Sequence, residues 1–190
     1  MGRKLPYFFR PHEERAFLKA CEDDSRNHAI FKTLFDSGLR ISELVGDKRT
    51  VYRGLYVEDI DFENRQFRVF GKGKKERMVV VSKQAIDEIL KWLGDRRSGK
   101  IFDMTPRMVQ KLAKKYAKEA GLPDWNKRGR WSPHKCRHTH ATRIVEKGGR
   151  DALVVAQEQL GHEGLGGTSI YLHTSIEYRK SVMQKVFGES

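Results

Sequence analysis

The chain has 190 residues, the length of one ordinary domain, and can bury a core without disulfides or metal. Lysine and arginine number 38 against 25 aspartates and glutamates, which gives a formal net charge of +13 and a sequence pI near 9.8. This excess favours nucleic acid as the partner over a membrane, because no apolar run approaches the length of a bilayer span. The start MGRKLPYFFR lacks a secretory hydrophobic region, and Cys21 and Cys136 lack metal-ligand spacing. We therefore expect a cytoplasmic, DNA-associated protein.

Two helices are predicted at the start of the chain. Apolar residues recur at helical spacing over residues 11–24 and 26–38, and Gly38 ends the second pattern. The spacing then shortens, since the segments YVEDIDF, QFRVFG and ERMVVV are rich in β-forming residues. The last two segments flank the turn GKGKK, which predicts a hairpin within a small antiparallel sheet.

Further helices are predicted after the sheet. Ser82 can cap a helix over 83–93, Thr105-Pro106 opens one over 106–120, and Ser132-Pro133 opens one over 134–147. Helical patterns also cover 151–160 and 175–187. The segment DWNKRGR at 124–130 is polar and basic, so we expect a loop that can approach DNA. The predicted fold class is mainly α with a small three-stranded antiparallel sheet, α+β.

Two motifs in the first half of the chain carry candidate site residues. In SGLRISEL, Arg40 follows the glycine stop and has Glu43 three residues later on one helical face. Taken alone, this pair also fits a surface ion pair. In GKGKKER, Lys72 lies between two glycines at a hairpin tip, although Lys72, Lys74 and Lys75 also fit a solvated run of charges.

Two motifs in the second half add to them. HKCRHTH places His134 and Arg137 at positions i and i+3 of a helix, so both can reach one anion near its N-terminus. The His and Cys residues of this motif do not have the spacing of a tetrahedral zinc set, so we expect no metal. LGH places His162 at a helix end, and Tyr171 follows in a glycine-rich stretch.

The order of these residues resembles the tyrosine recombinases, the phage-integrase and Xer-type site-specific DNA recombinases. The resemblance runs from about residue 5 to the C-terminus and rests on TLFDSGLRISELVG, DIDFENRQFRVFGKGKKERMVVV, SPHKCRHTHAT and EQLGHEGLGGTSIYLH. It implies the catalytic-domain fold of that family. It also implies a catalytic set with an accessory acid and nearby DNA contacts: Arg40, Lys72, His134, Arg137, His162 and Tyr171, with Glu43 as the acid and Lys74, Lys75, Arg77, Lys127, Arg128 and Arg130 as the contacts.

The resemblance implies a function as well. Tyr171 would attack a DNA phosphate and form a 3′-phosphotyrosyl bond, so that strands are cleaved and rejoined without ATP or any metal or other cofactor. Arg40 and Arg137 would bind the non-bridging oxygens, and Lys72 would protonate the leaving 5′ oxygen. His162 and His134 would donate a hydrogen bond or handle the tyrosine proton. The expected protein is a site-specific DNA recombinase, or integrase.

The sequence also departs from the family pattern. About eight residues, DKRTVYRG, separate SELVG from DIDF, and we expect them to lengthen the approach to the sheet without touching a catalytic position. Cys136 replaces a usual leucine and can fill the same buried slot. The sequence contains no match to the family's N-terminal core-binding domain. A truncated chain and a naturally minimal protein fit this equally well. Residues 1–10 would then be a linker remnant, 11–174 the catalytic domain and 175–190 a C-terminal helix or tail.

The expected partner is a double-stranded DNA attachment or recombination site. On DNA we expect a homo-oligomer, a tetramer, whereas the free chain should be mainly monomeric and make no membrane contact. The apolar side of 175–190 can dock on a neighbouring protomer or on its own core. Two alternative functions remain, a type IB topoisomerase-like DNA relaxase and a catalytically idle DNA-binding accessory protein.

Overall fold

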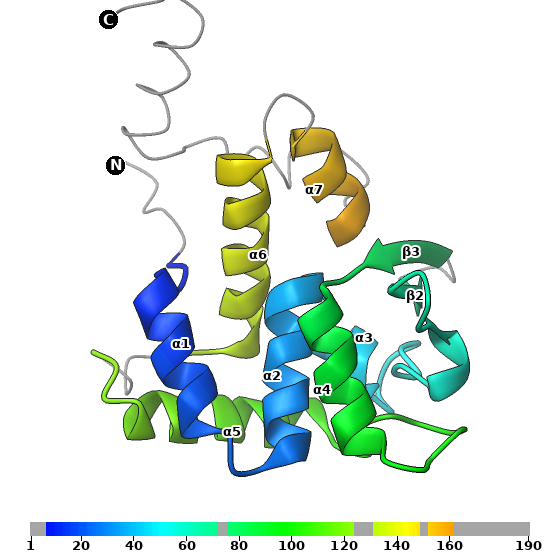
Figure 1. The fold of residues 1–190 in the computed structure, drawn as a ribbon, viewed down its shortest axis with the longest axis horizontal. Coiled ribbons are helices and arrows are strands. Elements are labelled where there is room, and N and C mark those ends of the chain that lie inside the picture. The colour runs from blue at the N-terminus through cyan, green and yellow to red at the C-terminus, as the bar shows by residue number, and fades with distance from the viewer. Residues whose placement is uncertain (1–6, 72–75, 124–130, 149–151, 162–190) are drawn as a thin grey trace, which may run out of the picture.

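The structure, a computed structural model, describes residues 7–71, 76–123, 131–148 and 152–161 (Figure 1). The predicted mainly α fold with a three-stranded antiparallel sheet is confirmed. The predicted helix over 175–187 lies outside the described residues. In chain order the elements are α1 (Pro11–Ala20), α2 (Ser25–Ser37), α3 (Ile41–Val45), the 3-10 turn η1 (Val57–Asp59), β1 (Ile60–Asp61), β2 (Gln66–Phe70), β3 (Glu76–Val80), α4 (Lys83–Leu93), α5 (Pro106–Glu119), α6 (Pro133–Lys147) and α7 (Ala152–Leu160).

Short polar side chains set several helix boundaries. The carboxylate of Asp24 accepts a backbone N–H from the first turn of α2, and this cap explains why the first helix ends before residue 24. Ser82 and Thr105 cap α4 and α5 in the same way, as predicted. Ser132 makes no such side-chain bond, so α6 begins with the proline that follows it. The segment predicted as the first strand begins with η1 and contributes only two residues to the sheet.

The hairpin of β2 and β3 decides which side chains face the interior. In its register Val69 lies opposite Arg77, and Phe67 lies opposite Val79. Cross-strand partners share a face of the sheet, as do alternate residues of one strand. Arg77 is therefore on the same face as the buried Val69 and Val79, whereas Met78 on the other face is 51% exposed. This alternation directs the Arg77 side chain toward the helices.

The helices surround one main hydrophobic core. In Figure 1, α5 lies across the base beneath the more upright α1, α2 and α4, and α2 packs against both α4 and α6. Phe9 packs edge to face on Phe17, Phe35 and Trp131, with ring centroids 4.9–5.5 Å apart. The backbone N–H of Phe9 also donates to Thr139 Oγ1 of α6 at 2.8 Å. Phe9 is therefore part of the main core, although it precedes α1.

The last described helix, α7, has a small core of its own. Apolar side chains of α6 and α7 form a second cluster: Ala141, Val145, Ala156 and Leu160. The helix α7 also contacts β3. These contacts bring its C-terminal end to the turn between α2 and α3, where the candidate site lies. None of the described helices is both long and apolar enough to span a bilayer.

Cys136 lies in the main core, in the apolar slot expected for it. It is 2% exposed, and burial raises the pKa of its thiol well above the usual value. Burial likewise raises the pKa of Cys21 to about 12. Both thiols are therefore protonated at neutral pH and pack as small apolar side chains.

Candidate active site

The turn between α2 and α3 is the point at which three helices meet. Gly38 ends α2 with a φ of 63°, a conformation that favours glycine. A Cβ at this position would lie 2.6 Å from Cδ2 of His140 on α6 and 2.9 Å from Cδ2 of Leu160 on α7. Only a glycine therefore lets α6 and α7 approach the turn this closely. The next residues in the chain are Leu39 and Arg40.

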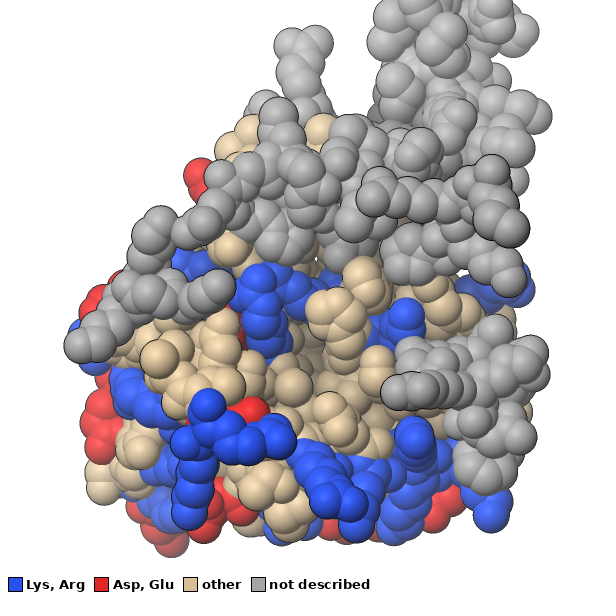
Figure 2. All heavy atoms as spheres, turned by 180° about the vertical axis from the view of Figure 1, so that it is seen from behind, with Lys and Arg blue, Asp and Glu red and all other residues tan. Residues whose placement is uncertain are grey.

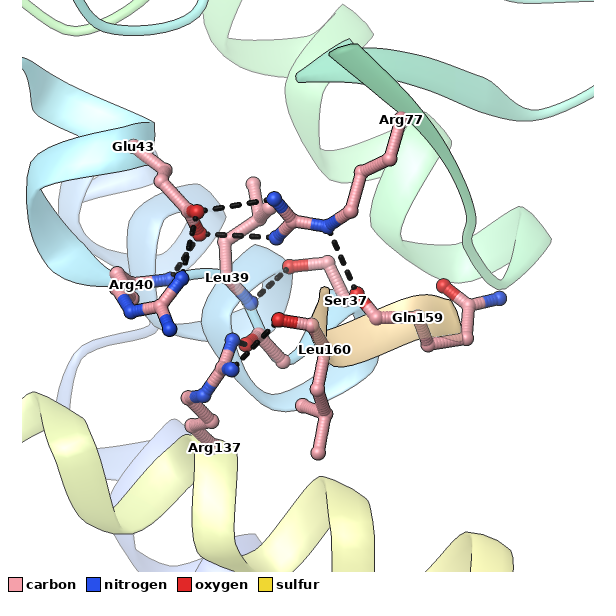
Figure 3. A network of polar contacts seen from close by, with 9 residues as sticks. Ser37, Leu39, Arg40, Glu43, Arg77, Arg137, Gln159 and Leu160 are labelled. Atoms are coloured by element: carbon pink, nitrogen blue, oxygen red, sulfur yellow. Dashed lines mark hydrogen bonds and ion pairs between the residues drawn. The ribbon is translucent and has the colours of Figure 1, made fainter. Parts of the chain in front are cut away.

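Arg40 and Glu43 form the pair expected from their spacing. The backbone N–H of Arg40 donates to Glu43 Oε2 at 2.7 Å, and its Nη1 donates to Oε1 at 3.0 Å (Figure 3). The Glu43 side chain is fully buried, whereas that of Arg40 is 37% exposed. Glu43 thus holds one side of the guanidinium group, and the rest of it is accessible from the surface. This arrangement presents a charged, oriented fork to an anion.

Arg77 reaches the same carboxylate from the sheet. Its Nη1 and Nη2 donate to the two oxygens of Glu43 at 3.0 Å each, and its Nε donates to the carbonyl of Gln159 at 3.2 Å (Figure 3). The Arg77 side chain is only 14% exposed. A Cβ on Gly161 would lie 3.0 Å from Arg77 Nε, so the chain after α7 passes directly against the guanidinium. This geometry favours a positioning role over the DNA contact expected from the sequence.

Arg77 and Arg40 keep Glu43 ionised. Burial alone would raise the pKa of this carboxyl, but hydrogen bonds and positive charge from Arg77, followed by those of Arg40, outweigh burial and lower it. Glu43 is therefore ionised at neutral pH. An ionised Glu43 keeps both guanidinium groups in fixed geometry.

Arg137 joins the ends of two helices. Its Nη1 donates to the carbonyl of Gly38 and its Nη2 to the carbonyl of Leu160, both at 2.7 Å (Figure 3). The residue is 2% exposed. Carbonyls at helix C-termini carry partial negative charge, which a buried cation stabilises. Arg137 thus fixes the ends of α2 and α7 relative to each other, a role that the sequence did not indicate.

His134 lies one helical turn before Arg137 on α6. Its ring packs edge to face against His138, with centroids 4.6 Å apart, and part of it is exposed. Desolvation lowers its pKa, and the charges of Arg137, Lys135 and Arg40 lower it further. His134 is therefore neutral at pH 7 and can accept a proton. His134 precedes Arg137 by one helical turn of α6, and Arg137 binds the carbonyl of Gly38, two residues before Arg40, so all three residues border the turn after α2.

The other predicted site residues lie outside the described part of the chain. They are Lys72, Lys74, Lys75, Lys127, Arg128, Arg130, His162 and Tyr171. The described network nonetheless borders two of the segments concerned, because β3 begins at Glu76 and Gly161 directly precedes His162. Arg77 binds both β3 and the end of α7 to Glu43. Arg77 therefore links the two chain segments that lead to Lys72 and His162 to Glu43, which in turn binds Arg40.

Comparison with known sequences identifies the family. The sequence profile of the Phage integrase family matches residues 7–177. This chain belongs to the phage integrase family. It is 32% identical over 204 residues to tyrosine recombinase XerC of Thermodesulfovibrio yellowstonii, with 96% of this chain and 63% of that protein covered. It is 37% identical over 191 residues to tyrosine recombinase XerC of Corynebacterium efficiens, with 92% and 56% covered. This family member thus spans less than two thirds of the length of these relatives.

Solved structures agree on the fold. The XerA recombinase superposes with a TM-score of 0.75 at 23% identity, covering 97% of this chain and 66% of that one. The XerH recombinase, solved in a post-cleavage complex with a palindromic difH substrate, gives a TM-score of 0.73 at 24% identity, covering 98% and 54%. The predicted tyrosine recombinase catalytic-domain fold of this phage integrase family member is confirmed.

Proposed function

We propose that this chain is the catalytic part of a site-specific DNA recombinase that cleaves and rejoins strands through a 3′-phosphotyrosyl intermediate at Tyr171. The observation that carries the proposal is that α6 brings Arg137, and His134 one helical turn before it, to the turn after α2 that carries Arg40. Glu43 and Arg77 connect this group to the chain that leads into His162. The family membership supports the same conclusion.

The site suits the charge of a phosphodiester. The anion repels a nucleophile until its non-bridging oxygens are neutralised, and the accessible guanidinium of Arg40 can do so with directed hydrogen bonds. Arg137 adds a second positive charge close to the turn. A buried, ionised Glu43 keeps Arg40 oriented before the substrate arrives, so less reorganisation is needed at the moment of reaction.

The proposed reaction conserves the phosphodiester. The Tyr171 oxygen loses its proton to a histidine, either the neutral His134 or His162, and bonds to phosphorus. The bond from phosphorus to the 5′ oxygen breaks, and Lys72 supplies the proton to that oxygen. A 5′-hydroxyl of another strand then attacks the phosphotyrosine in the reverse sense. Since one phosphate ester replaces another, we propose that neither ATP nor a metal or other cofactor takes part.

The proposed partner is a double-stranded recombination site. Figure 2 shows a face on which Lys and Arg side chains gather around a hollow, as a polyanion would require. Two proteins of similar fold have been solved with DNA, XerH bound to difH and the Tn1549 transposon integrase in complex with transposon right end DNA. We propose a homo-oligomer, a tetramer, on DNA and mainly monomer without it, with residues 175–190 docking on a neighbouring protomer.

Covalent trapping tests the proposal. Nicked duplexes with randomised arms allow the short 5′ fragment to diffuse away, so a phosphotyrosyl enzyme cannot reverse. The parent protein should retain selected duplexes through SDS gel electrophoresis. Sequencing of the retained DNA would give the target site. Binding without any SDS-resistant product would favour the idle accessory protein instead.

Lys72 provides a test of the chemistry. A 5′-bridging sulfur leaves as a thiolate and hardly needs a proton, so Lys72→Ala should cleave a sulfur-bridged strand nearly as fast as the parent. On the normal strand the same variant should be slower by roughly 10²–10⁴-fold. Lys74→Ala and Lys75→Ala serve as controls and should show no such rescue. Rescue at either of them would move the general acid to that position.

A further inference from the structure

The residues after α3 form a closed loop. Gly46 and Gly54 have φ values of 77° and 88°, and a Cβ on Gly54 would lie 2.9 Å from the Gly46 nitrogen. Within the loop, the N–H of Asp47 donates to the carbonyl of Tyr52 at 2.9 Å. The inserted residues therefore return to their starting point. The expectation that they lengthen the approach to the sheet is wrong, because the two glycines let the ends of the loop touch.

This closed loop, residues 47–53, borders a cleft of about 760 Å³ whose other wall includes Lys100 and the first turn of α5. Five cationic and only two acidic residues line the cleft. Among the residues that the structure describes, the side chains of Lys48, Lys100 and Arg107 have no hydrogen-bond or ion-pair partner. One of the two acids, Asp47, is occupied by Arg49 at 3.0–3.1 Å. Arg49 and Arg53 are thus paired with carboxylates, whereas the other three cations of the cleft have no internal counter-charge among the described residues.

The base of the loop is fixed in place. Arg53 donates to Asp59 at 2.6 Å, and its guanidinium lies over the rings of Tyr56 and Phe70 at 4.8 and 4.3 Å. Cations on a fixed loop lose less conformational entropy when they bind than cations on a free one. The exposed Lys48 at the tip is thus presented in a defined position.

We propose that the closed loop binds the sugar-phosphate backbone of duplex DNA beside the active site. The five residues of α3 separate Arg40 from the loop, a rise of about 7.5 Å. One DNA strand advances about 3.4 Å along the duplex axis per phosphate, so a duplex whose axis runs parallel to α3 brings a phosphate about two steps from the one at Arg40 within reach of Lys48. This inference rests on the proposed function, which supplies DNA as the ligand.

The test measures DNA binding as a function of salt. Lys48→Ala should lower the slope of log affinity against log salt by about 0.9, the value for one phosphate contact. Replacement of Lys48–Val51 by Asn-Gly should lower it further, while a two-residue turn keeps Asp47 and Tyr52 adjacent and leaves Arg53 in place. Lys91→Ala is the control, since Lys91 is an exposed lysine of α4 outside the cleft. Circular dichroism and thermal unfolding check that each variant is folded.

Phosphate ethylation interference locates the contact. The parent should show interference at a phosphate a few steps from the scissile one, and the Asn-Gly replacement should lose that signal alone. The rate of adduct formation at saturating DNA should stay within twofold of the parent.

If the parent binds DNA and the variants keep its salt slope and its interference pattern, the inference is overturned and the proposed function is left intact. A change in self-association or in capture of an acidic protein, with DNA binding unchanged, would overturn it too. A parent that binds no DNA would instead refute the proposed function.

Discussion

The buried cations beside the α2–α3 turn and the unpaired cations of the cleft differ in what they face. Arg77 and Arg137 are mostly buried and donate to protein acceptors, a carboxylate and three backbone carbonyls. Lys48 and Arg107 are exposed and have no acceptor in the described part of the chain. The same positive charge therefore serves two purposes. The buried Arg77 and Arg137 fix the geometry of the site, whereas the exposed Lys48 and Arg107 are available to a ligand.

The largest expected effect comes from the buried carboxylate. Glu43→Ala leaves the charge of Arg77 buried without its partner, so the free energy of unfolding should fall by about 3–5 kcal/mol. Urea denaturation measures this loss. The control is Asp87→Ala, which breaks an exposed pair with Lys83 and should cost about 0–0.5 kcal/mol. Equal losses in the two variants would mean that the buried carboxylate contributes no more to stability than an exposed one.

A buried histidine beside the same turn should make stability depend on pH. Burial lowers the pKa of His140 from 6.5 to about 4, and the ring also bonds to the Phe35 carbonyl. The unfolded chain therefore takes up this proton at higher pH than the folded one. Stability should be fully present above pH 6.5 and fall by about 3 kcal/mol as the pH drops to 4. His140→Gln should flatten the fall between pH 6.5 and 4, whereas a replacement of the exposed His12 by Gln should not.

Arg77 should act on rate and not on DNA affinity. Lysine keeps the charge but cannot form the two-pronged bond to Glu43, so Arg77→Lys should misplace Arg40 and slow adduct formation by roughly 10–100-fold. DNA affinity should stay within about twofold, the reverse of the pattern expected for Lys48→Ala. The double variant Arg77→Lys/Glu43→Gln should raise the activation free energy by less than the sum of the two single variants, because both substitutions remove the same contact. If Arg77→Lys instead loses DNA affinity and forms the adduct at the normal rate, Arg77 is a DNA-contacting residue.

The smallest expected effect concerns the remaining acid of the cleft. Asp103 is exposed and lines the same cleft as Lys48 and Arg107. Asp103→Asn removes repulsion from a bound phosphate, so DNA affinity at low salt should rise about twofold and the gain should vanish at high salt. Asp87→Asn on α4 is the control. A gain that persists in high salt would argue against an electrostatic cause.

Local signals in the sequence predicted much of the fold. The caps at Ser82 and Thr105 and the stop at Gly38 each act through a neighbouring backbone group, and all three lie where expected. The alternation of strand residues also indicates the direction of Arg77. It is in phase with the buried Val79 of β3 and with the buried Val81 that follows the strand, so its side chain points toward the interior.

Contacts between distant parts of the chain could not be predicted in this way. The acceptors of Arg137 are backbone carbonyls 99 and 23 residues away, and a carbonyl has no sequence signature. The contact between Gly46 and Gly54 closes a loop that looks like an extended insertion in the sequence. Phe9 lies outside any periodic segment, yet it packs against Trp131 more than a hundred residues later.

The most direct test of the account is to identify the residue that carries DNA. The parent protein trapped on a nicked duplex is digested with protease, and the DNA-linked peptide is sequenced by mass spectrometry. We predict that the linked residue is Tyr171, and that Tyr171→Phe binds the same duplex as tightly as the parent but forms no adduct, because one hydroxyl is lost and the phosphate-binding cations remain. An adduct in Tyr171→Phe, or a link to any other residue, would contradict the proposed chemistry.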